Sequence, residues 1–175
     1  VYGAVTWGQF FVYQGFNEFC GWMHTSSQVD VADLYDVLIK EKDNGDLVYE
    51  YDKKERPVTR KIITIPYKRQ TWGLAAKSIE VLYTHHGPVM AKRSEYSQAL
   101  RHYNRSMQGL IQSWQRTKAK SFAEFKKTMD LRANTSNNTV YADAQGNIAY
   151  WHGNFIPKRD PKYDWSKPVP GNTSA

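Results

Sequence analysis

The chain has 175 residues, and 41% of them are hydrophobic, so it is long enough to bury a core of its own. Its formal net charge is +7, but the basic residues are interspersed with acidic ones in segments such as 40–43 and 53–56, which favours a solvated face over a nucleic-acid site. No stretch approaches the roughly 18 apolar residues of a membrane span. The single cysteine, Cys20, excludes an internal disulfide. Val1 opens directly into strand-like sequence, which favours an internal piece of a larger protein.

Residues 1–96 are predicted to be mainly β-structure. Short runs of aromatic and β-branched residues, separated in part by turn residues, indicate strands. Asn44 and Gly45 predict a hairpin turn between two of these runs, because glycine accepts a positive φ. The expected strands lie at 9–14, 19–23, 31–38, 47–51, 60–65 and 77–83, and the fifth of them is expected to end at Pro66.

Residues 97–131 are predicted to be helical. A first helix is indicated by apolar residues at the spacing i, i+3, i+4, i+7, which form one packing face: Met107, Leu110, Ile111 and Trp114. A second helix is expected to begin at a capping box, in which Ser121 caps a backbone N–H group and Glu124 reaches back. Its buried stripe is expected to be Phe122, Phe125 and Met129.

Residues 132–175 are predicted to return to β-structure. Two runs at 138–143 and 147–152 flank a turn that contains Gly146, which is the pattern of a hairpin. The tail from 155 to 171 is rich in proline and is expected to be extended. Two β zones around a helical pair predict an α+β fold, which we take as a single domain over residues 1–175.

Three groups of residues have the composition of a functional site. His85 and His86 are candidates for metal ligation, although adjacent histidines on a strand point to opposite faces. The carboxylates of Asp30, Asp33 and Asp36 suit a hard cation such as calcium, or they cap turns and pair with nearby lysines. Asn138 begins an apolar strand, where its amide is either a donor to an oxyanion or an ordinary turn asparagine.

Five segments, taken in order, resemble the penicillin acylases and acyl-homoserine-lactone acylases. Each motif is weak alone, but together they extend over nearly the whole chain. The segments are GFNEFCGWMHTS at 15–26, VDVADLY at 29–35, YTHHGP at 83–88, NTVYADAQGNIAY at 138–150 and PVPG at 168–171. The resemblance implies that the chain is an internal fragment of the β chain of an N-terminal-nucleophile (Ntn) hydrolase. It also implies part of an αββα-type sandwich of antiparallel strands with an inserted helical pair.

The resemblance implies a chemistry as well. Such enzymes mature by self-cleavage that exposes an N-terminal serine, whose amino group serves as base while its hydroxyl attacks an amide and forms an acyl-enzyme. Asn138 and the backbone N–H of Ser26 would form the oxyanion hole, and Thr25 would line its edge. Arg159 would organise the site near the nucleophile's amine. A structural calcium ion would be held in part by Asp30, Asp33 and the carbonyl oxygen of Ala32.

The fragment is expected to be inactive alone, because Val1 is no nucleophile. Its partners would be the remaining α and β chain segments and a small-molecule amide, with no nucleic acid. An uncovered sheet edge predicts pairing with a second copy or a neighbour's strand. A periplasmic or secreted location follows from the resemblance alone. A non-catalytic binding module remains the alternative, with a stacking surface built from aromatic residues: Trp7, Phe10, Phe11, Tyr13, Trp22, Trp72 and Trp151.

Overall fold

A computed structural model describes residues 1–104 and 106–174, so Arg105, within the predicted helical zone, and Ala175 lie outside the described residues. Antiparallel strands and two helices make an α+β fold, as expected from the sequence. The elements in chain order are β1 (Tyr2–Ala4), β2 (Gln14–Phe16), β3 (Cys20–Ser26), β4 (Ala32–Val37), β5 (Ile39–Glu41), β6 (Leu47–Tyr51), β7 (Lys54–Pro57), β8 (Thr59–Lys68), β9 (Leu74–Tyr83), β10 (Val89–Lys92), β11 (Ser97–His102), α1 (Met107–Arg116), α2 (Phe122–Met129), β12 (Asn137–Asp143), β13 (Ile148–Trp151) and β14 (Val169–Pro170).

The chain divides into two compact units. The first unit comprises Val1–Val31 and Tyr103–Lys158, and the second comprises Ala32–His102 and Arg159–Ala175. Each unit combines segments far apart in the sequence, so a reading along the chain finds no boundary of composition between them.

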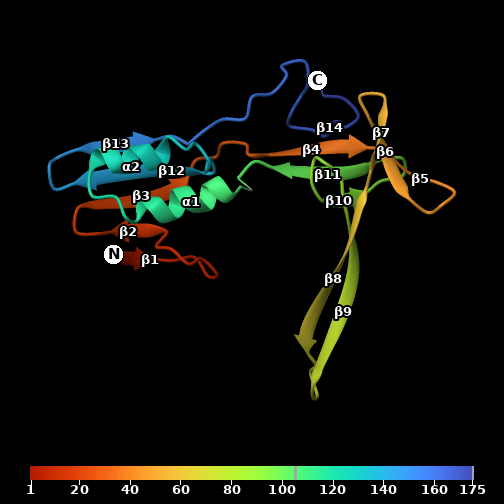
Figure 1. Ribbon diagram of the computed structural model, residues 1–175, viewed down its shortest axis with the longest axis horizontal. Helices are drawn as coiled ribbons and strands as arrows, with labels where there is room; N and C mark the ends of the chain where they lie inside the picture. The colour runs from red at the N-terminus through yellow and green to blue at the C-terminus, as the bar shows by residue number, and fades with distance from the viewer. Residues whose placement is uncertain (105, 175) are drawn as a thin grey trace. The chain divides into compact units, whose positions relative to one another are not determined.

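The first unit is a five-stranded sheet in the order β1-β2-β3-β12-β13, with α1 and α2 on one face (Figure 1). The predicted hairpin is β12–β13, and Gly146 in its turn has a φ of 88°. Phe125 of α2 lies 6.3 Å from Trp22 and 4.7 Å from Tyr141, measured between ring centroids, so α2 packs on β3 and β12. Phe125 and Met129 are buried as predicted, and Phe122 is partly buried against the same core.

The capping box of α2 is present with one difference from the prediction. The Ser121 hydroxyl accepts the N–H of Glu124 at 3.2 Å. The Glu124 carboxylate accepts the N–H of Lys120 at 2.8 Å, one residue before the capping serine. Both bonds satisfy donors at the start of the helix, which otherwise lack intrahelical partners.

The packing face predicted for α1 is wrong. Met107 is 69% exposed and Trp114 is 43% exposed. The buried side chains of α1 are Gln112, Ser113 and Arg116. This polar face can be buried because backbone groups of loops form hydrogen bonds with it. The side-chain oxygen of Gln112, for example, accepts a hydrogen bond from the N–H of Ala133 at 2.9 Å.

The second unit contains the sheet β10-β11-β4-β14, the three-stranded sheet β5-β6-β7 and the hairpin β8–β9 (Figure 1). Residues 97–102 form strand β11, which contradicts their assignment to the helical zone. They pair antiparallel with β4, from Ser97 opposite Val37 to His102 opposite Ala32. Pairing with β4 buries Ala99 completely, and this long-range contact overrides the local sequence preference.

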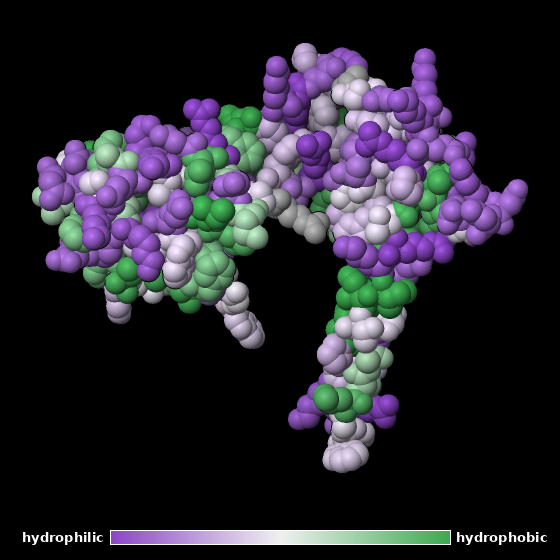
Figure 2. All heavy atoms as spheres, viewed as in Figure 1, coloured by the Kyte–Doolittle hydropathy of each residue, from purple (hydrophilic) through white to green (hydrophobic). Residues whose placement is uncertain are grey.

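Two turns of the second unit bear on the sequence predictions. The turn at Asn44-Gly45 is confirmed, with Gly45 at a φ of 84° between β5 and β6. Strand β8 does not end at Pro66 but continues to Lys68, opposite Leu74. The proline is tolerated because β8 has β9 on one side alone, so the ring nitrogen faces an open edge. Figure 2 shows hydrophobic residues along this hairpin. Ile62 of β8 is 68% exposed.

The segment 9–14 was predicted to be a strand, but only Gln14 of it belongs to β2. Phe11 is nevertheless buried, and Phe10 and Phe11 make an edge-to-face contact at 5.3 Å. The aromatic run is thus used for packing in a loop rather than for strand pairing. Among the described residues, no helix is long and apolar enough to cross a membrane.

Candidate active site

The residues predicted to form the oxyanion hole lie together where β3 meets β12. Asn138 of β12 lies directly opposite Thr25 of β3, and Asn137 lies opposite Ser26. The amide nitrogen of Asn138 donates to the Thr25 hydroxyl and to the Ser26 carbonyl oxygen, at 3.2 Å each. Its amide oxygen accepts the N–H of Gly153 at 3.2 Å. Asn138 is 8% exposed, so this side chain is fixed in one orientation by both ends of its amide.

The backbone N–H of Ser26 points away from β12. The next residue, Ser27, donates its N–H to Ser136 at 3.0 Å, on the β12 side. Because successive N–H groups of a strand alternate in direction, the N–H of Ser26 lies on the other edge of β3. The N–H of His24 points to the same edge, where it meets the Gln14 side chain at 3.5 Å. Pairing with β2 extends along β3 to Trp22, so Ser26 lies beyond it.

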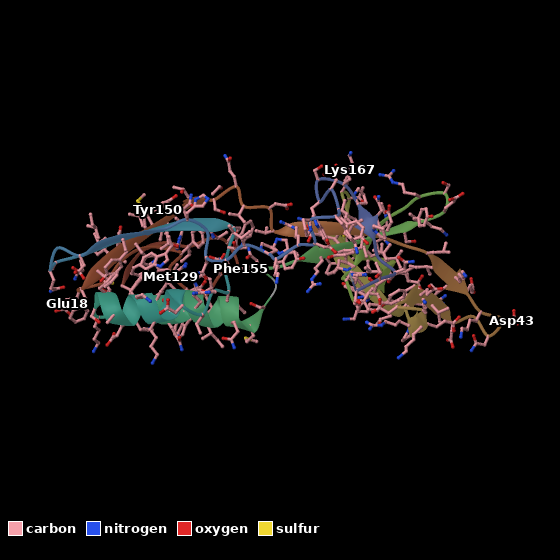
Figure 3. The ribbon with its side chains drawn as sticks, turned by 90° about the horizontal axis from the view of Figure 1, so that it is seen from above. Glu18, Asp43, Met129, Tyr150, Phe155 and Lys167 are labelled. Atoms are coloured by element: carbon pink, nitrogen blue, oxygen red, sulfur yellow. The ribbon has the colours of Figure 1, made fainter. Side chains whose placement is uncertain are left out.

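Asn138 and Thr25 lie on the face of the sheet opposite the helices. Trp22 and Tyr141 face α2, and side chains one residue away along each strand face the other side. That second face is rich in exposed apolar side chains, which we call the open sheet face: Tyr2, Phe16, Met23, Val140, Ile148 and Tyr150. Figure 3 shows Tyr150 on the side of the sheet away from the helices, whereas Met129 lies on the helix side. The predicted donors thus border an apolar surface.

Arg159 is placed in the second unit, where it pairs with Asp33 of β4. Its Nε and one Nη donate to the same carboxylate oxygen of Asp33, at 3.0 and 2.9 Å. The side chain of Asp33 is 1% exposed and that of Arg159 is 15% exposed. The structure therefore joins the arginine predicted for the active site to a carboxylate predicted to bind calcium.

The predicted calcium ligands are two carboxylates and one backbone carbonyl, from Asp30, Asp33 and Ala32, and the structure does not test them. Asp30 belongs to the first unit, whereas Ala32 and Asp33 belong to the second. Within residues 1–104 and 106–174, no group of three His, Cys, Asp or Glu residues is able to hold a metal ion. Asp36 has another partner, since its carboxylate accepts a hydrogen bond from Gln98 at 3.1 Å. The calcium ion stays a prediction, and it requires ligands from outside this set.

His85 and His86 lie in a turn rather than on a strand, so the expectation of opposite faces is wrong. Their ring centroids are 3.8 Å apart. His85 is hydrogen-bonded through Nδ1 to the Tyr49 hydroxyl at 2.7 Å, and His86 donates from Nε2 to the Gly171 carbonyl oxygen at 2.8 Å. Burial and the adjacent His86 lower the pKa of His85 to about 4. Both rings therefore have structural partners in the second unit.

Sequence reasoning missed two buried polar residues beneath Asn138. His24, 8% exposed, lies on the helix side of β3, where its Nδ1 is 3.2 Å from the carbonyl oxygen of Asn138. Arg116 of α1 is 1% exposed and donates to the carbonyl oxygen of Tyr13 at 3.1 Å. A signal for His24 existed: it follows Cys20 and Trp22 at alternate positions on the buried face of one strand.

The whole chain, residues 1–175, matches the family model described as penicillin amidase. The chain belongs to the penicillin amidase family. Among solved structures, it is similar to a thermostable penicillin G acylase from Alcaligenes faecalis, with a TM-score of 0.77 and 23% sequence identity. The match covers 97% of this chain and 30% of that acylase, so the chain spans less than a third of its length and shares the fold of that part.

Proposed function

We propose that the complete protein containing this chain is an amide hydrolase that cleaves linear amides through an acyl-enzyme on an N-terminal serine. In this proposal the chain supplies the oxyanion donors and their scaffold, and other segments supply the nucleophile. The observation that carries the proposal is the placement of Asn138 against Thr25 and Ser26 at the border of the open sheet face. Membership of the penicillin amidase family gives this arrangement its chemical context.

The geometry of Asn138 supports a role as donor. The bond from Gly153 to its amide oxygen turns the NH2 group toward Thr25 and Ser26. In both hydrogen bonds that this group donates, the nitrogen lies 3.2 Å from the accepting oxygen, at the weak end of the range for N–H···O hydrogen bonds. A negatively charged oxygen accepts a hydrogen bond about twice as strong as a neutral acceptor does. An oxyanion would therefore displace one of these neutral acceptors.

The open sheet face supports the same proposal. Exposed apolar side chains such as Ile148, 82% exposed, and Tyr150, 59% exposed, are costly to leave in water. We propose that remaining segments of the protein cover this face and, in doing so, exclude water from the donors. Hydrogen bonds to a developing charge are stronger in such a dry environment. On this account the isolated chain binds no substrate productively, and the role of Arg159 near the nucleophile stays a prediction.

The alternative, an aromatic binding module, has less support. Phe11 is 6% exposed and Trp22 is 3% exposed, so both belong to the core and are not available for stacking. Trp7 and Phe10 are exposed in the first unit, whereas the exposed Trp72 belongs to the second. The predicted aromatic set is therefore not one surface within either unit.

Steady-state kinetics of the complete protein on a chromogenic N-acyl anilide tests the proposal. We expect Asn138→Asp, which keeps the shape but removes the donor, to lower kcat about 10²–10³-fold with little change in KM. Asn147→Ala is the matched control, since Asn147 lies at the far end of the same hairpin, bonded to Asp143 at 2.9 Å. An Asn138→Asp enzyme with the kcat of the wild type would overturn the proposed donor role.

A further inference from the structure

A layer of buried polar side chains lies directly beneath the proposed donors. His24 contacts β12 at two points, with its Nδ1 3.2 Å from the carbonyl oxygen of Asn138 and 3.1 Å from the Thr139 hydroxyl. The ring of Tyr13 lies 4.8 Å from the ring of His24, and the guanidinium of Arg116 lies over the same tyrosine at 5.8 Å. All of these residues belong to the first unit.

The contacts favour one tautomer of His24. A carbonyl oxygen only accepts hydrogen bonds, so the contact of Nδ1 with the carbonyl oxygen of Asn138 favours the form in which Nδ1 carries the hydrogen. Nε2 is buried, and among the described residues it has no hydrogen-bond partner. A doubly protonated ring would bury a positive charge beside that of Arg116, so the neutral form is favoured. Burial and that charge accordingly lower the pKa of His24 to about 4.

Arg116 is an unusual neighbour for a histidine. It is 1% exposed, and its Nε is also buried without a hydrogen-bond partner among the described residues. Burial lowers the pKa of Arg116 to about 10, which still leaves the group charged at neutral pH. Arg116 from α1 thus faces His24 as a charged group, and Tyr13 faces it as a titratable but neutral phenol because burial raises the pKa of Tyr13, while β12 presents the uncharged Asn138 and Thr139.

We propose that His24 is a positioning residue that fixes the backbone of Asn138 and thereby aims the oxyanion donors. The inference rests on the proposed function above. His24 touches the face of the strand pair opposite the donors, so it acts through the backbone and not on the substrate. The Nδ1–H bond holds the carbonyl of Asn138, and the side chain of the same residue holds Thr25 and Ser26 on the other face. Donors to an oxyanion must be placed within about 0.5 Å to be effective.

Core packing alone does not explain a histidine at this position. The same face of β3 carries Cys20 and Trp22, which are apolar and buried in one cluster. An apolar residue in place of His24 would avoid the unpaired Nε2, which is a cost in a buried site. The part of the ring that does have partners is the Nδ1 side, directed at Asn138 and Thr139.

Two substitutions in the complete protein separate positioning from packing. His24→Asn places an amide N–H near the position of Nδ1, whereas His24→Leu keeps the bulk and removes the donor. We expect His24→Leu to lower kcat about 10–100-fold with KM changed less than about twofold, and His24→Asn to recover most of kcat. Cys20→Ala is the control on the same strand and face, expected to lower stability while kcat stays near that of the wild type.

The outcomes distinguish this inference from the proposed function. If Asn138→Asp lowers kcat but His24→Leu does not, or if His24→Asn and His24→Leu are equally impaired, the positioning role is wrong and the donor role stands. If Asn138→Asp leaves kcat unchanged, both are wrong. A second readout needs no activity: 15N NMR of the chain should show His24 neutral and protonated on Nδ1. A ring protonated on Nε2 at neutral pH would overturn the inference even if His24→Leu failed to fold.

Discussion

Arg159 places two N–H groups on a single carboxylate oxygen of Asp33, at 3.0 and 2.9 Å, in a pair whose acidic partner is almost entirely buried. Asp33 is the second residue of β4 and Arg159 begins the last segment of the second unit, so the pair links residues 126 positions apart in the chain. Removing one partner of such a buried pair is strongly destabilising, because the remaining charge is buried without its counter-ion.

Loss of one partner of this pair should be strongly destabilising. We expect Asp33→Ala to lower the free energy of unfolding by about 3–5 kcal/mol, because it leaves a guanidinium largely buried without its carboxylate. The double variant Asp33→Ala with Arg159→Met should lose less than the sum of the two single variants, since no lone charge remains. Urea denaturation of the four proteins measures the coupling, and additive losses would show that the ion pair contributes little.

Lowering the pH should decrease the stability of the first unit, because His24 is neutral and buried in the folded state. Its folded-state pKa of about 4 lies below the ordinary value of 6.5, so between these values the unfolded state binds more protons than the folded state. The contribution of neutral His24 is therefore complete above about pH 6.5 and is lost as the pH falls toward about 4. The total loss is on the order of 3 kcal/mol.

His24→Asn removes this titration and isolates its effect from that of other groups. Denaturation with urea at a series of pH values should show a smaller loss of stability on acidification for His24→Asn than for the wild type. His85 and His86 also have lowered pKa values, but they remain in both proteins and cancel in the comparison. Parallel curves for the two proteins over this range would contradict the neutral, buried state of His24.

Gly87, in the turn that follows β9, should not tolerate a side chain. Its φ is 145°, and a Cβ atom there would lie 2.0 Å from the carbonyl oxygen of Leu100. We expect Gly87→Ala to lower the free energy of unfolding of the second unit several times more than Gly45→Ala does. The Gly45→Ala change costs about 1 kcal/mol. Gly45 is the matched control because its φ is also positive, at 84°, but nothing lies within 4 Å of the added atom. Equal midpoints of thermal unfolding for the two variants would contradict this account.

The fold was predicted best where local chemistry decides it. The hairpin at Gly146, the turn at Gly45 and the cap at Ser121 each depend on a few adjacent residues, and all three are present. Residues 97–102 were misassigned because their conformation depends on pairing with β4, which lies 60 to 70 positions earlier. The apolar face of α1 was misjudged for a related reason. Hydrophobic spacing predicts a helix, but which face is buried depends on distant loops, whose backbone groups bond to Gln112 and Arg116 on the other face.

The candidate site shows the same division. The motif order led to Asn138, Thr25 and Ser26, and the register of β3 with β12 brings these residues together. The pairing of Arg159 with Asp33 could not be derived from spacing, because it joins distant segments whose partners are set by the fold. The histidine at position 24 is visible among apolar residues in the sequence. It was missed because the carbonyl group that it contacts belongs to another strand, distant in the sequence.

The most direct test of the central claim is the intact mass and N-terminal sequence of the complete protein after expression. The account predicts cleavage into two chains, the second beginning with a serine located before this segment, and no cleavage when that serine is replaced by alanine. Incubation with an acyl substrate should then add the mass of one acyl group to the serine-starting chain. The proposed N-terminal nucleophile would be contradicted by a protein that remains uncleaved, yields no chain with an N-terminal serine and carries no acyl adduct.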